Sequence, residues 1–165
     1  LNAYSLFNLT NQWEVRDIQN ELLGNMFTNV GQNTSVLLLN SGSGYSKINQ
    51  TYYINATQSG SGTVSYNLQG ISKNILGNTI SGHFISVKAI AITNDGTGQI
   101  EFVTTGNSVL ADMLGSSTGS IFLSSGGMFT VNNPSGISLS STNKYLSLKP
   151  NNTNVSYRMV VLGDG

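Results

Sequence analysis

The sequence predicts an all-β protein that folds as a two-sheet sandwich, and three observations point to this class. Ser, Thr, Asn and Gly supply 78 of the 165 residues, whereas Asp, Glu, Lys and Arg supply only 14. Hydroxyl and amide side chains compete for nearby backbone groups, so they favour turns and β-surfaces over helices. Apolar runs of strand length recur between turn signals along most of the chain, as they do in sandwiches and barrels.

Length and charge limit the organisation and the partners of the chain. A chain of this length fits one domain, residues 1–165, in which 1–30 are a candidate N-terminal arm. Roughly 70% of the unfolded surface can be buried at this size, so a core forms without disulfides, and the sequence has no cysteine. Seven acidic residues balance seven basic ones, which argues against nucleic acid and anionic lipid as partners. No apolar run approaches the roughly 20 residues of a membrane span.

Residues 12–23 carry a helical pattern near the start of the chain. Apolar side chains recur there at steps of three and four, and acidic side chains fall on the opposite face. Asn11 and Glu14 have the spacing of a capping box, and Gly24 is a natural stop. The spacing therefore predicts a short amphipathic helix whose apolar stripe is the expected contact element. The residues of this candidate contact helix are Trp13, Val15, Ile18, Leu22 and Met26.

The remainder of the chain predicts about ten short strands separated by turns rich in Gly, Asn and Ser. Residues 84–93 form the longest strand, and because both of its faces are mostly apolar we expect it to be central. Residues 109–114 are expected to form one helical turn. The number of strands and the spacing of the turns suit a jelly-roll-like or related two-sheet β-sandwich. The expected strands cover 36–39, 52–54, 64–68, 84–93, 100–103, 121–123, 128–131, 137–139, 145–148 and 155–162.

No combination of residues forms a convincing catalytic, cofactor-binding or metal-binding motif. His83 is the only histidine, and a histidine-based triad or zinc site needs partners that the sequence lacks. Residues 115–119 match the hydrolase pattern G-x-S-x-G, but they precede an expected strand instead of following one, so a loop is the better interpretation. We therefore expect a protein that is not an enzyme and that needs no cofactor.

Four tyrosines in the first half of the chain are candidate ligand-stacking residues. Aromatic faces stack on sugar rings, and Asn and Ser side chains supply the hydrogen bonds that a glycan needs. Tyrosines on strands are more often half-buried residues of the sheet itself, and this structural interpretation is the stronger one. The four residues are Tyr45, Tyr52, Tyr53 and Tyr66.

A series of segments in residues 80–163 has a pattern familiar from virus particles. The segments are 80–85 (ISGHFI), 88–94 (KAIAITN), 121–123 (IFL), 126–129 (GGMF), 133–136 (NPSG) and 157–163 (YRMVVLG). In these segments the chain resembles small virion proteins of tailed phages, notably capsid decoration (cement) and head-fibre proteins of β-sandwich fold. The resemblance implies a structural protein that caps, joins or projects from a shell. It implies no catalytic residues.

The sequence therefore favours a non-enzymatic virion structural protein, in first place a phage capsid decoration protein. Its expected partner is the major capsid protein or another virion protein, and it is expected to form homo-oligomers, with a trimer as the leading state. Its expected location is the virion surface, after assembly in the host cytoplasm. The alternative is a receptor- or carbohydrate-binding β-sandwich module of a tail, fibre or secreted protein, with a glycan as the ligand.

Overall fold

The computed structural model describes the backbone of residues 4–8, 12–16, 22–27, 36–41, 47–73, 79–115, 118–151 and 154–165. Side chains are described from residue 47 onward, except for 72–81, 116–117 and 152–153. Strands dominate these residues, which confirms the all-β class. Within the described part of the chain, no helix has the length and the apolar character needed to cross a bilayer.

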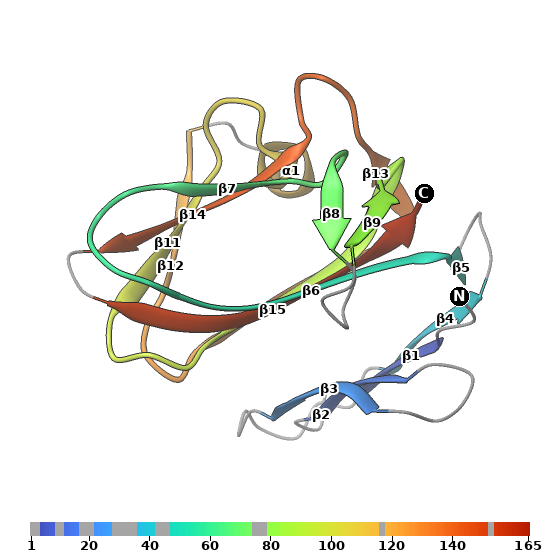
Figure 1. Cartoon of the computed structure of the whole chain (residues 1–165), viewed down its shortest axis with the longest axis horizontal. Helices are drawn as coiled ribbons and strands as arrows, with labels where there is room; N and C mark the ends of the chain where they lie inside the picture. The colour runs from blue at the N-terminus through green and yellow to red at the C-terminus, as the bar shows by residue number, and fades with distance from the viewer. Residues whose placement is uncertain are drawn as a thin grey trace.

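Two four-stranded antiparallel sheets form a sandwich (Figure 1). In spatial order, the first sheet consists of β13 (Met128–Ser138), β10 (Ser86–Asn94), β15 (Val155–Asp164) and β6 (Gln50–Gln58). The second sheet consists of β12 (Ser120–Leu123), β11 (Gln99–Val103), β14 (Tyr145–Asn151) and β7 (Val64–Asn67).

The strand pairs of the sandwich are nested in the sequence. The outermost pair is β6 with β15, followed inward by β7 with β14, β10 with β13, and β11 with β12. Two further antiparallel pairs, β10 with β15 and β11 with β14, join these hairpin-like pairs into the two sheets. The chain therefore follows the path of one long hairpin that has been rolled up into two sheets.

The core lies between the two sheets, where alternate residues of each strand point inward. In β11, Ile100 and Phe102 are fully buried while the residues between and beside them are half-exposed. In β15, Tyr157, Met159 and Val161 join the same cluster. The rings of Phe102 and Phe129 pack with centroids 4.8 Å apart, which joins the two sheets across the core.

All nine residues of β10 are buried, which confirms the prediction of a central strand in this region. Ile90 and Ile92 belong to the core between the sheets, so their neighbours Ala89 and Ala91 lie on the outer face of the first sheet. The register shifts between Val87 and Ala89 in both pairings of β10, as expected at a β-bulge.

Smaller elements close the ends of the sandwich. The predicted helical turn at 109–114 is confirmed as α1 (Val109–Leu114). The side chain of Ser108 caps its start by accepting a hydrogen bond from the Leu110 amide, and Gly115 ends it in the left-handed conformation. A short hairpin, β8 (Ile71–Lys73) with β9 (Thr79–Gly82), connects the second sheet to the first.

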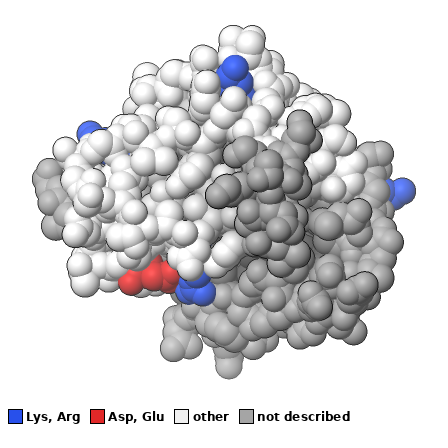
Figure 2. All heavy atoms as spheres, in the orientation of Figure 1, with Lys and Arg blue, Asp and Glu red and all other residues white. Residues whose placement is uncertain are grey.

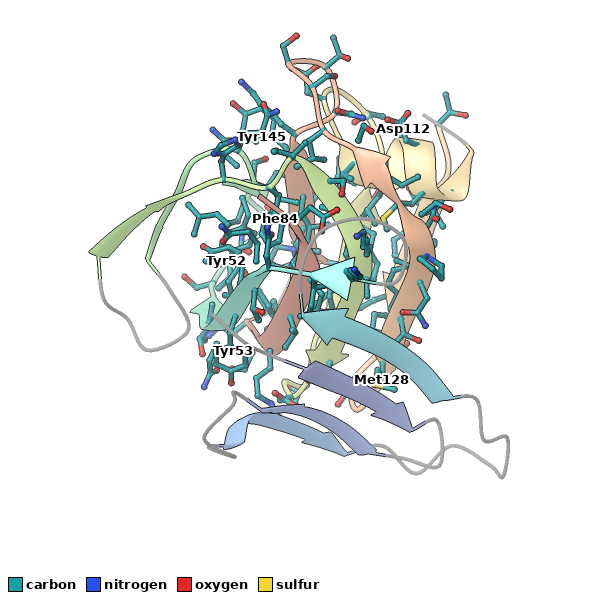
Figure 3. The ribbon with its side chains drawn as sticks, turned by 90° about the vertical axis from the view of Figure 1, so that its right-hand side faces the viewer. Tyr52, Tyr53, Phe84, Asp112, Met128 and Tyr145 are labelled. Atoms are coloured by element: carbon teal, nitrogen blue, oxygen red, sulfur yellow. The ribbon has the colours of Figure 1, made fainter. Side chains whose placement is uncertain are left out.

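A separate sheet precedes the sandwich in the chain. It consists of β1 (Tyr4–Asn8), β2 (Gln12–Arg16), β3 (Leu22–Phe27), β4 (Val36–Ser41) and β5 (Lys47–Ile48), in the order β3-β2-β1-β4-β5. Figures 1 and 3 show β1 to β4 on the side of the first sheet that faces away from the second. This N-terminal sheet is thus a third layer beside the sandwich.

The predicted helix over 12–23 is not what the structure shows for the described residues of this region. They form β2 and β3, which pair as an antiparallel hairpin with Trp13 opposite Met26 and Val15 opposite Gly24. Residues 12–16 (QWEVR) also alternate polar and apolar, so the same short run satisfies a period of two, and pairing with neighbouring strands selects that period. Ile18, the centre of the predicted stripe, lies outside the described residues.

Candidate functional site

Candidate catalytic residues do not converge in the described part of the chain. His83 is exposed in the segment between β9 and β10. Gly115, which opens the G-x-S-x-G match, is the residue that ends α1, so the match follows a helix and not a strand. Among the described residues, no group of three or more His, Asp or Glu side chains is arranged to hold a metal ion.

The candidate stacking tyrosines lie in different environments. Tyr52 and Tyr66 pack against the core, with ring centroids 6.5 Å apart and ring planes at 70° to each other. The Tyr66 hydroxyl lies 2.5 Å from the hydroxyl of buried Tyr157. Tyr53 follows Tyr52 in β6 and therefore points to the outer face of the first sheet, and Figure 3 shows it below Tyr52. Tyr45 lies outside the described residues.

Burial changes the titration of the three clustered tyrosines. Desolvation is the largest cause that raises the pKa of Tyr52, Tyr66 and Tyr157, and for Tyr66 the hydrogen bond to Tyr157 adds to it. A phenol that is hard to ionise and whose hydroxyl is already paired inside the sandwich is suited to a structural role. This arrangement favours Tyr52 and Tyr66 as parts of the core rather than as platforms for a ligand.

This cluster predicts that the protein loses stability in alkaline solution. The folded-state pKa values lie above the ordinary tyrosine value of about 10, so the unfolded chain releases these protons first. The contribution of the cluster is therefore fully present below about pH 10 and is lost as the pH rises through the folded pKa values. We expect the midpoint of urea unfolding to fall above about pH 10, and this fall to be smaller for the Tyr66→Phe variant. An equal fall in both proteins contradicts the assignment.

The outer face of the second sheet is mostly polar and partly exposed, and it also carries Val103 and Tyr145. Glu101 lies opposite Phe122 of β12 on one side and opposite Lys149 of β14 on the other. One oxygen of Glu101 accepts a hydrogen bond from Ser120 at 2.9 Å, and the other lies 3.7 Å from the Lys149 ammonium. Phe122 is half exposed (51%), and Ile85 is the other large apolar side chain with this degree of exposure among those described.

Further hydroxyl and amide pairs cross the same face. The side-chain amide of Asn151 donates a hydrogen bond to the side-chain oxygen of Gln99 at 3.0 Å. This pair lies two residues along the strands from Glu101 and Lys149. Two serine hydroxyls, Ser65 of β7 and Ser147 of β14, lie 2.8 Å apart. Each of these pairs fixes the direction in which polar atoms are presented, so the face carries a fixed set of hydrogen-bonding groups.

The outer face of the first sheet is apolar at its centre and is covered. Ala89, Ala91, Val160 and Leu162 are exposed by 1% or less, although they point away from the core between the sheets. Their burial requires another layer on this face, and β1 to β4 lie on this side in Figures 1 and 3. The two outer faces of the sandwich therefore differ: one is covered and the other is open.

A buried ion pair stands at the edge of the covered face. Lys88 is fully buried, and its ammonium lies 2.8 Å from Asp164, which also accepts a hydrogen bond from Ser86 at 3.3 Å. Lys88 donates a further hydrogen bond to the backbone carbonyl of Lys47 in β5. The backbone amide of Asn49 donates a hydrogen bond to the backbone carbonyl of Gly163 at 3.1 Å. The end of β15 therefore holds the segment that leads from the N-terminal sheet into the sandwich.

The remaining surface carries few charges, as Figure 2 shows for one face. Arg158 binds Asp95 with two hydrogen bonds of 2.7 and 2.9 Å, and this contact is the largest cause that raises the pKa of the Arg158 guanidinium. The pair joins the turn after β10 to β15. This ion pair is partly exposed, and it holds the turn after β10 against β15.

Sequence reasoning missed the two groups that are most distinctive in the structure. Lys88 offered a signal, because a single charge in the middle of the apolar run 84–93 must find a partner when the strand is central. Phe122 and Glu101 offered none, because their proximity depends on which strand pairs with which. The candidate contact residues Trp13, Val15, Leu22 and Met26 lie in β2 and β3.

No family model, no curated protein and no solved structure matches the chain.

Proposed function

We propose that this chain is a non-enzymatic structural protein of a tailed-phage virion, of the capsid decoration type, built on a jelly roll. The observation that supports the proposal best is the nested strand order. Eight strands form two antiparallel sheets, and they pair as β6 with β15, β7 with β14, β10 with β13 and β11 with β12. This order follows the path of a jelly roll with two Greek keys. Viral capsid proteins and lectins use this fold repeatedly.

Composition and surface chemistry support the same function. The chain is rich in residues with neutral hydroxyl and amide side chains, and it has no net charge. Such a chain offers little mutual repulsion between copies that stand close together on a shell. The mechanism would be burial of surface across capsomer joints, where an interface of about 1,600 Å² suffices when many copies act together.

The N-terminal sheet is the element that we propose to contact the shell. It forms a layer of its own on one side of the sandwich, and its link to the sandwich is held by Lys88 and Asn49. Attachment through this layer leaves the opposite face of the sandwich pointing outward. We propose that the protein acts there as a homo-oligomer, with a trimer as the expected state, on the virion surface after assembly in the host cytoplasm.

Rebinding to stripped shells tests this proposal. Full-length protein added to purified shells that lack it should sediment with them and saturate at a fixed number of copies per shell. The Leu22→Asp variant should lose this binding, because it places a charge in the proposed contact sheet, whereas Phe122→Ala on the opposite face should bind normally. Failure of the unaltered protein to sediment with the shells contradicts a decoration role.

A receptor- or carbohydrate-binding module is the second candidate function. The observation that favours it is the open face of the second sheet, with Phe122 among fixed polar groups.

A further inference from the structure

We propose that the outer face of the second sheet is a binding site for a neutral polysaccharide chain. The residues that would make the site are Phe122 and Ser120 of β12, Glu101 and Gln99 of β11, and Lys149 and Asn151 of β14. This inference rests on the second candidate function, for which it names the ligand class, and it concerns the face that attachment to a shell leaves free.

The ring of Phe122 offers an apolar surface for stacking. The outward neighbours Ser120 and Glu101 of Phe122 are polar, and Val103 of β11 is a partly exposed apolar neighbour beside them. Phe122 adds a large apolar surface that is half exposed. The apolar face of a pyranose ring stacks on an aromatic ring, and water is released from both surfaces when it does so. One exposed aromatic ring with a single partly buried apolar neighbour, Val103, offers enough apolar surface for one sugar ring. An apolar protein patch needs several exposed apolar residues side by side.

Polar side chains near the ring supply hydrogen-bonding groups for a sugar. Glu101 is directly opposite Phe122 in the register, and Ser120 and Lys149 hold its two oxygens in place. Gln99 and Asn151 form a hydrogen-bonded pair two residues further along β11 and β14. Carboxylate and amide groups in fixed directions bind the hydroxyl groups of a sugar without a large loss of side-chain entropy, because their neighbours already order them.

The charge of the site decides which class of glycan it can bind. Glu101 carries the negative charge of this cluster, and Lys149 lies 3.7 Å from it with opposite sign. The two cancel, so the site has no net positive charge to attract sialic or uronic acids. Neutral hexoses are therefore the expected ligands, and acidic sugars should bind no better than neutral ones.

The sheet also provides the right form for an extended ligand. Strands in a sheet are about 4.8 Å apart, so the row Phe122, Glu101 and Lys149 spans three strands and about 10 Å. This distance corresponds to about two sugar units. A chain that crosses the strands can thus place one ring on Phe122 and the next over Glu101 and Lys149.

An immobilised array of neutral and sialylated oligosaccharides, followed by NMR titration with the best neutral oligosaccharide, tests the proposal on the full chain. We expect retention of neutral glycans with a dissociation constant of about 1 mM or lower, and amide shifts concentrated in β11, β12 and β14. Retention of no neutral glycan overturns the proposal, as does a preference for sialylated ones. Amide shifts confined to other strands also overturn it.

Substitutions at Phe122 separate stacking from general apolar contact. Phe122→Leu should weaken binding about tenfold or more, whereas Phe122→Trp should keep it, because only the second retains an aromatic face. Ile85→Ala is the matched control, since Ile85 is comparably exposed (55%) but lies outside the second sheet. Glu101→Gln should weaken binding without changing the melting temperature. Equal binding by the Leu and Trp variants overturns the stacking role, and the shell-rebinding result is independent of either outcome.

Discussion

Replacing Lys88 with alanine is expected to lower the free energy of unfolding by about 3–5 kcal/mol. Lys88 is fully buried in β10, and Asp164, only 17% exposed at its side chain, lies 2.8 Å from its ammonium. Removal of the lysine leaves a largely buried carboxylate without its counter-charge, and the Lys47 carbonyl also loses its donor. The cost comes mainly from the charge that remains, because a buried pair as a whole contributes little over an apolar replacement.

Two comparison variants make this prediction specific. The double variant Lys88→Met with Asp164→Asn removes both charges and should recover most of the lost stability. Arg158→Ala breaks the partly exposed pair with Asp95 and should cost only about 0–1 kcal/mol, because water screens that pair. Urea unfolding of the four proteins measures all of these differences. A Lys88→Ala variant no less stable than Arg158→Ala contradicts the account of the buried pair.

Placing aspartate at Leu162 is expected to lower the free energy of unfolding by about 3 kcal/mol or more. Leu162 lies on the outer face of the first sheet, is fully buried and has Val160 beside it at 1% exposure. The core between the sheets is on the other side of β15, so the layer that covers Leu162 must be the one outside the sandwich. A carboxylate placed under that layer has no partner and cannot reach water without displacing it.

Ser156→Asp is the matched control on the same strand and the same face. Ser156 is partly exposed, and its hydroxyl lies 2.9 Å from that of Thr57, so a charge there can stay hydrated. We expect a change within about 0.5 kcal/mol. Thermal or urea unfolding compares the two variants, and a Leu162→Asp variant as stable as Ser156→Asp would show that this face is open to water.

Patterns that depend on single strands could be predicted from the sequence. The apolar character of both faces of 84–93 predicted a central strand, and β10 is buried along its whole length. The turn at 109–114 was also predictable, because Ser108 and Gly115 are cap residues at the right spacing. These features are determined by the local sequence, so predicting them does not require knowledge of the strand order.

Features that depend on pairing between distant strands could not be predicted. The N-terminal region shows this for secondary structure: the apolar residues at 13, 15, 22 and 26 fit both periods, and the pairing of β2 with β3 selects the strand. The open face shows it for the site, because Glu101 meets Phe122 and Lys149 only when β11 lies between β12 and β14. The sequence identifies the tyrosines as candidates, but it does not show which side chains point into the core. That depends on the register of β6 and β7.

The most direct test of the proposed function measures the heat resistance of virus shells with and without this protein. Shells that lack the protein should release their DNA at a lower temperature than complete ones, and addition of the full-length chain should restore the original temperature. The Leu22→Asp variant should fail to restore it, and the Phe122→Ala variant should succeed. Release at the same temperature with and without the protein, at full occupancy of the shell, would contradict a role in stabilising the capsid.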